Sequence, residues 1–308
     1  MAMIRISFYE LTLLVILMTL SFSKEINYYN NDGESFADVK INDLVFNCRV
    51  AGLENSGDAI ILLHGFPETS RMWHDLIKVL DENNYRVIAP DQRGYSRKAR
   101  PNSPEDYRID KLSDDVINIA NQFDINKFHL VGHDWGSGVG WYLSSKNPNR
   151  LITFTALSVP HLDAFLEMMR IDKEQQKKSQ YISWFKRPIL PEIYFKIFGY
   201  KNLDRIWNKS SDKEKQKYLE IFKQKGALKA TLNWYRANIS NSSESIGDIY
   251  VSTLIIYGKE DMAVAERSVD ESEKFLKGDY RIEKIDSGHW LVQESFNVVS
   301  NSILDHIR

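Results

Sequence analysis

The sequence predicts an α/β protein with a mainly parallel sheet, helices on both faces and a helical segment inserted late in the chain. Short apolar runs of strand length alternate with helical spacing between about residues 59 and 157. The alternation stops between about 160 and 248, then returns. The chain has 308 residues, of which 43% are hydrophobic, enough for one large core that carries an insertion.

The first predicted elements form a β-hairpin. Phe36–Ile41 and Leu44–Val50 alternate apolar and polar residues, and Asn42-Asp43 joins them. Later apolar runs predict strands at Ala59–Leu63, Arg86–Ala89, Phe128–Val131, Leu151–Leu157, Thr253–Tyr257 and Arg281–Ile285. Helical spacing predicts helices over 72–80, 109–123, 135–147 and 296–306.

The inserted segment, residues 160–248, is expected to form a helical cap. It lacks strand signals, is rich in lysine, glutamine and aromatic residues, and shows helical spacing over 192–198 and 214–222. The remaining parts, residues 36–159 and 249–308, are expected to form the α/β core.

Charge and cysteine content exclude some classes of protein. The formal net charge is −2 and no basic run occurs, so a nucleic-acid partner is not expected. The single cysteine, Cys48, cannot form an intrachain disulfide. It lies in an alternating stretch, where we interpret it as a small strand residue.

Residues 1–23 resemble a targeting segment. Arg5 precedes the apolar run Leu11–Leu20, and Ser21-Phe22-Ser23 supplies small residues for cleavage. We expect a cleaved signal peptide and a secreted or secretory protein; the alternative is a retained anchor, and membrane association is expected only in that case. A secretory route would make the chain a glycoprotein, because it contains sequons at Asn208, Asn238 and Asn241.

The strongest local motif is Gly132-His133-Asp134-Trp135-Gly136, which follows a predicted strand and precedes a predicted helix. This pattern is typical of a nucleophile elbow, a strained turn that projects its central side chain above the sheet. The central residue is Asp134. A carboxylate that attacks an electrophilic sp³ carbon forms an alkyl ester on the protein, so the sequence favours alkyl rather than acyl transfer.

A second motif, His64-Gly65-Phe66-Pro67, directly follows the strand Ala59–Leu63. Folds of this kind place an oxyanion-hole donor at this turn. The backbone N–H groups of Phe66 and Trp135 are therefore the expected donors, and the Phe66-Pro67 bond is a candidate cis peptide.

The third signal completes a catalytic set. Gly288-His289-Trp290 follows the last predicted strand, and Asp261 follows the strand before it. The chain order nucleophile, acid, histidine matches this architecture. His289 is the candidate general base for water and Asp261 the residue that orients it. Glu260 is the nearest rival for the role of Asp261.

With these motifs, the sequence resembles the epoxide hydrolase branch of the α/β-hydrolase superfamily from residue 36 onward. The motifs 64–68 (His-Gly-Phe-Pro-Glu), 132–136 and 288–290 have the family's form. In the cap, 232–236 (Leu-Asn-Trp-Tyr-Arg) resembles the second-tyrosine motif, and Tyr181 falls where the first cap tyrosine is expected.

The resemblance implies conversion of an epoxide to a vicinal diol through an Asp134 ester that His289-activated water hydrolyses. Tyr181 and Tyr235 would protonate the epoxide oxygen, because an alkoxide is a poor leaving group. The side chains of Phe66, Trp135 and Trp290 are expected to contact substrate. The implied partners are a small epoxide and water, with no cofactor and no metal.

Two positions depart from the family pattern. Ser137 stands where many epoxide hydrolases have glycine, and Arg93-Gly94-Tyr95-Ser96 lacks the usual second glycine. Some haloalkane dehalogenases share the Asp134–Ser137 sequence. Neither departure falls on a proposed catalytic group.

Several alternatives use related machinery. A haloalkane dehalogenase would use the same Asp134 ester but needs halide donors, and the Phe66 side chain offers none. A fluoroacetate dehalogenase would carry arginine in place of Trp135, and a serine esterase would need serine at the elbow. A non-catalytic ligand-binding relative would be expected to lack the histidine or the acid, and measuring turnover would discriminate it.

Overall fold

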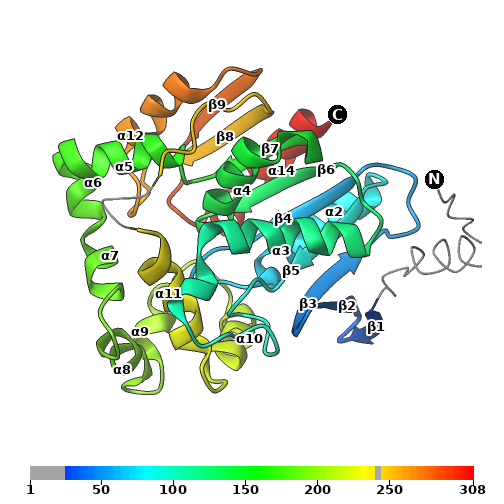
Figure 1. The fold of residues 1–308 in the computed structure, drawn as a ribbon, viewed down its shortest axis with the longest axis horizontal. Helices are drawn as coiled ribbons and strands as arrows, with labels where there is room; N and C mark the ends of the chain where they lie inside the picture. Colours follow the sequence, from blue (N-terminus) through cyan, green and yellow to red (C-terminus); the bar gives the residue numbers. More distant parts are fainter. Residues whose placement is uncertain (1–24, 240–243) are drawn as a thin grey trace, which may run out of the picture.

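A nine-stranded sheet runs through the part of the chain that the computed structural model describes, residues 25–239 and 244–308 (Figure 1). The strand order is β1-β2-β3-β5-β4-β6-β7-β8-β9. Strands β1 to β3 pair antiparallel with each other and β3 pairs antiparallel with β5, whereas all pairs from β5 to β9 are parallel. The predicted fold class, an α/β-hydrolase fold with a mainly parallel sheet, is confirmed.

The central strands are buried on both faces. Every residue of β4 and β6 is buried, as expected for parallel strands with helices on either side. The strands are β1 (Ile26–Asn31), β2 (Glu34–Ile41), β3 (Leu44–Ala51), β4 (Ala59–Leu63), β5 (Arg86–Pro90), β6 (Phe128–His133), β7 (Leu151–Leu157), β8 (Ser252–Gly258) and β9 (Tyr280–Ile285).

Helices cover the two faces of the sheet. Helices α3 (Ile109–Gln122) and α4 (Trp135–Lys146) pack together on one face, and α2 (His74–Glu82) packs with α14 (Phe296–Ile307) on the other (Figure 1). Two short helices, α12 (Glu266–Asp270) and α13 (Leu291–Glu294), follow β8 and β9. Because strands β4 to β9 run parallel, their carboxyl ends lie at the same edge of the sheet. Folds of this kind bind ligands at that edge.

The stretch between β7 and β8 is helical wherever it has regular structure in the described residues, and it extends beyond the carboxyl ends of the strands (Figure 1). Its helices are α5 (Leu162–Ile171), α6 (Lys173–Lys178), α7 (Gln180–Phe185), α8 (Leu190–Lys196), α9 (Lys201–Asp204), α10 (Asp212–Phe222) and α11 (Ala227–Asn238). We call these seven helices the cap.

The sheet begins about ten residues earlier than the sequence suggested. We expected the core to start at residue 36, but β1 pairs with β2 along its whole length. Its residues are mostly exposed, because β1 is an edge strand with little packed against it. It therefore lacks the apolar alternation that reveals a half-buried strand.

The N-terminal targeting segment lies outside the described residues. Within residues 25–239 and 244–308, no helix combines the length and apolar character needed to cross a membrane.

Candidate active site

The nucleophile elbow forms where β6 meets α4. Asp134 lies between them with φ 51° and ψ −120°, a strained conformation for a residue with a side chain. The turn is tight: a Cβ on Gly132 would lie 2.4 Å from the carbonyl oxygen of Gly136, and a Cβ on Gly136 would lie 2.0 Å from that of Leu63. Only glycine fits at both positions. Close backbone contact therefore explains why glycines flank Asp134 in the elbow motif.

The Asp134 carboxylate sits among backbone donors. The N–H of Phe66 donates to its Oδ1 at 2.7 Å, and the N–H of Trp135 also donates to the carboxylate. A Cβ on Gly65 would come within 2.2 Å of Oδ1, so glycine is needed for this approach. The Phe66-Pro67 peptide is cis. Both donors proposed from the sequence therefore reach the carboxylate of the elbow residue.

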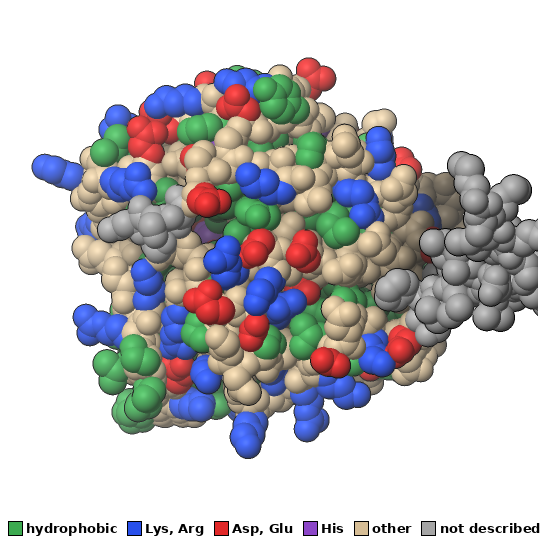
Figure 2. Space-filling view, in the orientation of Figure 1, with side chains coloured by type: hydrophobic (Ala, Val, Ile, Leu, Met, Phe, Trp, Pro, Cys, Tyr) green, Lys and Arg blue, Asp and Glu red, His purple; other side chains and the backbone are tan. Residues whose placement is uncertain are grey.

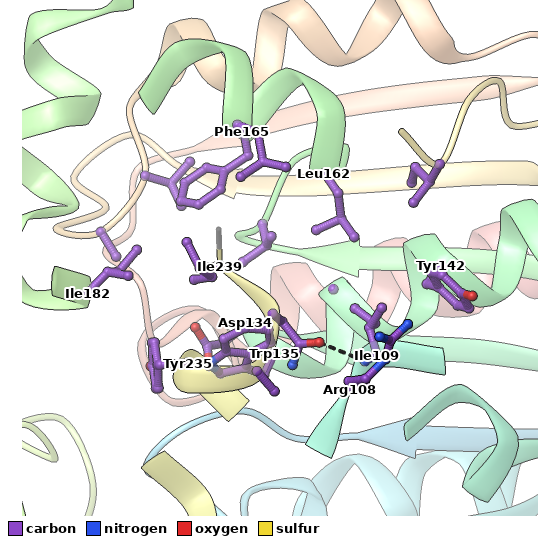
Figure 3. Close-up of a pocket in the computed structure, with 18 of the residues that line it drawn as sticks. Arg108, Ile109, Asp134, Trp135, Tyr142, Leu162, Phe165, Ile182, Tyr235 and Ile239 are labelled. Atoms are coloured by element: carbon purple, nitrogen blue, oxygen red, sulfur yellow. Dashed lines mark hydrogen bonds between the residues drawn. The ribbon is translucent and has the colours of Figure 1, made fainter. Parts of the chain in front are cut away.

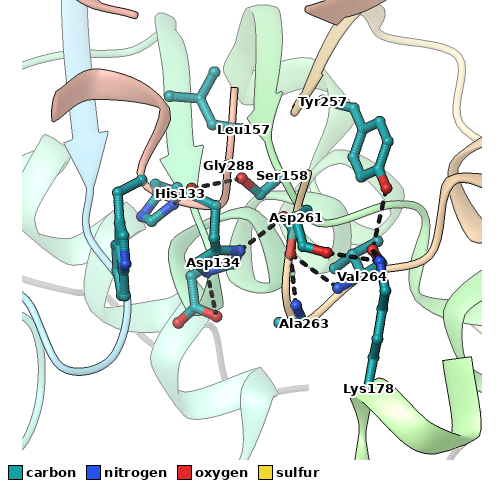
Figure 4. A network of polar contacts seen from close by, with 12 residues as sticks. His133, Asp134, Leu157, Ser158, Lys178, Tyr257, Asp261, Ala263, Val264 and Gly288 are labelled. Carbon is teal, nitrogen blue, oxygen red and sulfur yellow. Dashed lines mark hydrogen bonds and ion pairs between the residues drawn. The ribbon is translucent and has the colours of Figure 1, made fainter. Parts of the chain in front are cut away.

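His289 and Asp261 lie beside this carboxylate (Figure 4). Nδ1 of His289 is 2.8 Å from Oδ2 of Asp261, and Nε2 is 3.7 Å from Oδ2 of Asp134. The other oxygen of Asp261 accepts from the backbone N–H groups of Ala263 and Val264 at 2.7 and 2.9 Å. Glu260 points to solvent, so Asp261 rather than its neighbour reaches the histidine.

Electrostatics couple the three groups. Burial raises the pKa of Asp134, but the nearby His289 outweighs burial, so the pKa lies below its ordinary value. Burial lowers the pKa of His289, but the charges of Asp261 and Asp134 raise it to about 10. At 3.7 Å the contact with Asp134 is an ion pair rather than a hydrogen bond, so we assign this effect to charge. At neutral pH the site thus holds an imidazolium at His289 beside the Asp134 carboxylate.

Two cap tyrosines complete the site. Tyr235 on α11 lies with its ring 5.1 Å from that of Trp135 and 6.2 Å from that of Tyr181 on α7. Burial, together with the charge of Asp134, raises the pKa of both phenols. Both hydroxyls therefore remain protonated at neutral pH, as a proton donor requires.

Asp134, His289 and both tyrosines line one cavity of about 380 Å³ between core and cap. In Figure 3, Asp134, Trp135 and Tyr235 lie on one side of it, and Leu162 and Phe165 on the other. Its apolar lining consists mainly of Ile109, Val159, Leu162, Phe165, Leu166, Ile182, Ile239, Ile246 and Val264. Charged residues are confined to Asp134, His289 and a partly exposed end with Arg108, Asp110 and Glu244.

Two of the residues predicted to contact substrate, Phe66 and Trp290, are not among those that line this cavity. The Phe66 side chain packs against the rings of Phe185, Phe222 and Tyr235 outside the cavity lining, so only its backbone reaches Asp134. Trp290 is buried beside His289, with ring centroids 4.9 Å apart, and also lies outside the lining. The Phe66 ring therefore packs against rings of the cap, and the Trp290 ring packs against His289. Trp135 does line the cavity.

The two departures from the family pattern have structural roles. The Ser137 hydroxyl donates to the carbonyl of Gly132 at 2.7 Å, which ties α4 to the elbow. In residues 93–96, which lack the second glycine, the Ser96 hydroxyl donates to the carbonyl of Asp91 at 2.6 Å and accepts from the N–H of Asn47 at 2.9 Å. Neither residue lines the cavity.

Sequence reasoning missed Lys178, which fixes the acid loop from the cap (Figure 4). Its Nζ donates to the backbone carbonyls of Asp261 at 2.6 Å and Val264 at 2.9 Å. No local pattern marks this lysine, since its partners lie more than 80 residues away and are backbone atoms. The loop that orients His289 is therefore held by both core and cap.

Sequence reasoning also assigned no role to Glu68, although it belongs to the motif 64–68. Its carboxylate is buried and lies 3.5 Å from Nδ1 of His133, whose other ring nitrogen is 2.9 Å from the carbonyl oxygen of His289. Tyr218 and Gln293 donate to the same carboxylate. The Glu68 carboxylate and His133 therefore form a buried polar network that contacts the backbone of His289.

Comparisons with known proteins agree with this architecture. A family model described as alpha/beta hydrolase fold matches residues 58–295. The AB hydrolase superfamily protein YfhM of Bacillus subtilis is 35% identical over 284 residues, which cover 90% of this chain and 99% of that protein. Epoxide hydrolase 4 of Mus musculus is 28% identical over 277 residues, 86% of this chain and 77% of the mouse protein.

A solved structure shares the fold. The epoxide hydrolase of Bacillus megaterium, crystallised with an inhibitor, superposes with a TM-score of 0.78 at 22% identity and covers 91% of this chain and 99% of its own. The chain therefore belongs to the α/β-hydrolase superfamily. The resemblance to its epoxide hydrolase branch, predicted from the motifs, is confirmed.

Proposed function

We propose that this protein hydrolyses epoxides to vicinal diols through a covalent ester on Asp134. One observation carries the proposal: a carboxylate held by two backbone N–H groups faces two buried, protonated tyrosines in one largely apolar cavity. This pairing suits a substrate that needs a nucleophile at carbon and an acid at oxygen. The apolar lining favours an apolar epoxide.

In the first half-step, Oδ2 of Asp134 attacks an epoxide carbon and the ring C–O bond breaks. Oδ1 is already engaged by Phe66, so Oδ2, which faces His289, is the free oxygen. Tyr181 or Tyr235 gives its proton to the departing oxygen, and the protonated His289 restores it. The products are a hydroxyalkyl ester and a neutral imidazole.

In the second half-step, neutral His289 takes a proton from water while the water oxygen attacks Cγ of Asp134. Ester formation removes the Asp134 charge that raised the pKa of His289, so the imidazole becomes a competent base. Negative charge develops on Oδ1, where the N–H of Phe66 stabilises it, and the N–H of Trp135 also donates to this carboxyl group. Cleavage of the Cγ–Oδ2 bond releases the diol, which takes the carboxyl proton.

The test is diol formation across a panel of terminal and internal epoxides, with haloalkanes as controls. We expect diols from apolar epoxides and no halide release. Halide release without diol would favour a dehalogenase, whose chemistry shares the Asp134 ester. Binding of epoxides without turnover would favour a ligand-binding relative.

The fate of the oxygen atoms gives a second test. Because Cγ–Oδ2 is the bond that breaks, the first diol molecule carries an oxygen from Asp134. A single turnover in ¹⁸O-water should give unlabelled diol and one labelled oxygen in the peptide that contains Asp134. Label in the first diol would indicate direct attack of water on the epoxide.

We also propose that the protein enters the secretory pathway with cleavage near Ser23, supported by the apolar run Leu11–Leu20 and the small residues after it. An N-terminal sequence beginning at Met1 or Ala2 would refute cleavage. Asn238 is less available than the exposed Asn208, because the Asn238 side chain bonds the backbone of Ile109, Tyr107 and Trp234. Glycopeptide mapping should find Asn208 or Asn241 modified in preference to Asn238.

A further inference from the structure

An exposed apolar patch covers the outer end of the cap. Among the described residues, thirteen large apolar side chains are exposed, and six of them lie within residues 189–198. They are Ile189, Leu190, Ile193, Tyr194, Ile197 and Phe198, with exposed fractions from 46% to 75%. Figure 2 shows them as the cluster of apolar side chains at the lower left, where Figure 1 places α8.

Basic residues surround this patch. Residues 186–209, which we call the cap tip, contain six lysines and arginines but only two acidic residues, whereas the whole chain has a net charge of −2. One of the two, Glu192, is neutralised by Arg236 at 2.9 Å. Lys186, Arg187, Lys196, Lys201, Arg205 and Lys209 are all exposed. An apolar face with a basic border is the composition of surfaces that bind anionic bilayers.

The cap tip is also joined to the active site. The Tyr194 ring lies 4.9 Å from that of Trp184 on α7, and the Phe195 ring lies 5.5 Å from that of Phe185. Phe185 in turn contacts Tyr181 and Tyr235, with ring centroids at 5.2 and 5.1 Å. A surface that holds the cap tip would therefore hold the cap helix that lines the catalytic cavity.

We propose that the cap tip docks on the surface of an anionic phospholipid bilayer, with its six apolar side chains in the interfacial layer and its basic residues at the lipid headgroups. Charge complementarity selects this partner, because five of the six exposed cations form no ion pair with the described residues; the sixth, Lys209, lies 3.8 Å from Glu294. Docking of the cap tip does not depend on the reaction. In Figure 1, α8 and β1 lie at opposite sides of the molecule.

A site-specific fluorescent label tests this proposal in the full chain. Cys48 is fully buried, so Phe198→Cys provides a single accessible thiol for an environment-sensitive dye. Val298→Cys, 49% exposed on α14, is the matched control. Vesicles of phosphatidylserine and phosphatidylcholine should shift the emission of the label at 198 to shorter wavelength and leave the label at 298 unchanged. Vesicles of phosphatidylcholine alone should give a much smaller shift at 198.

A second set of variants tests the basic border. Lys196→Gln and Lys201→Gln should each weaken the anionic-lipid response of the label at 198 about five-fold. The pair Lys78→Gln and Lys277→Gln, exposed lysines outside the cap, should leave it unchanged. No shift at 198, or equal shifts at 198 and 298, would overturn the proposal. A shift at 198 that grows with protein concentration without vesicles would overturn it in favour of self-association.

Discussion

The core and the cap supply different residues of the proposed catalytic site, and they hold these residues in different ways. Asp134, Asp261 and His289 stand on turns after β6, β8 and β9, and the two carboxylates accept backbone N–H groups. Tyr181 and Tyr235 stand on cap helices and are held largely by neighbouring rings.

This difference separates the tasks of the two regions. Backbone donors in a strained turn fix the nucleophile and the oxyanion site, as an electrostatically preorganised centre requires. Ring packing tolerates small adjustments, so we expect the positions of Tyr181 and Tyr235 to adjust to the substrate. We therefore expect changes in the core to abolish chemistry, and changes in the cap to reduce it by degrees.

The largest expected effect is the loss of the nucleophile. Asp134→Ala removes the only group that can form the ester, so diol formation should fall at least about 10³-fold. Asp114→Ala, an exposed carboxylate on α3, is the matched control and should keep its activity. Diol formation by Asp134→Ala within ten-fold of the wild type would end the covalent mechanism.

The cap tyrosines should matter less individually. Tyr181→Phe and Tyr235→Phe should each slow ester formation on the order of 10²-fold, because one proton donor remains, and the double variant should nearly abolish it. Stopped-flow measurement of alkylation gives the rates, with Tyr194→Phe as a cap control outside the cavity lining. Normal epoxide opening by the double variant would show that the cap supplies no acid.

The next prediction concerns Lys178, which joins the cap to the loop that carries Asp261. Lys178→Met removes two hydrogen bonds to the acid loop, so His289 should be oriented less well. We expect hydrolysis of the ester to slow about ten-fold while its formation changes little. Single-turnover kinetics separate the two steps, and an equal loss in both would assign Lys178 a general structural role.

The smallest expected effect is on stability against pH. The pKa of His289 is raised from 6.5 to about 10 in the folded chain, so the protonated histidine stabilises the fold fully below pH 6.5, and this stabilisation is lost as the pH rises through about 10. The melting temperature should therefore fall less over this interval in His289→Gln than in the wild type. Identical pH profiles would place the pKa of His289 near its ordinary value.

The fold and the core site were largely predictable because their causes are local. Buried parallel strands appear as short apolar runs, and Gly132 and Gly136 mark a turn where no side chain fits. These signals located Asp134 without any tertiary information. Edge strand β1 escaped prediction since exposure removed its pattern.

The cap and the supporting residues were harder to predict because they depend on tertiary packing. Lys178 contacts backbone carbonyl groups, which every residue has, so no sequence pattern indicates these contacts. The ring contacts of Phe66 and Trp290 could not be predicted, since a motif specifies a backbone position but not the direction of a neighbouring ring. The exposure of Ile193 and Phe198 likewise follows only from how α8 packs.

The central claim is that Asp134 forms an ester that only His289-activated water can break. Intact-mass spectrometry of His289→Gln, mixed briefly with an epoxide that the wild type converts quickly, tests it directly. We expect a mass gain of one epoxide per chain, mapped to the peptide that contains Asp134, with diol near background because general-base catalysis contributes about 10²–10⁴-fold. Asp134→Ala should gain no mass. An unmodified His289→Gln chain would contradict the account, because water would then attack the epoxide directly.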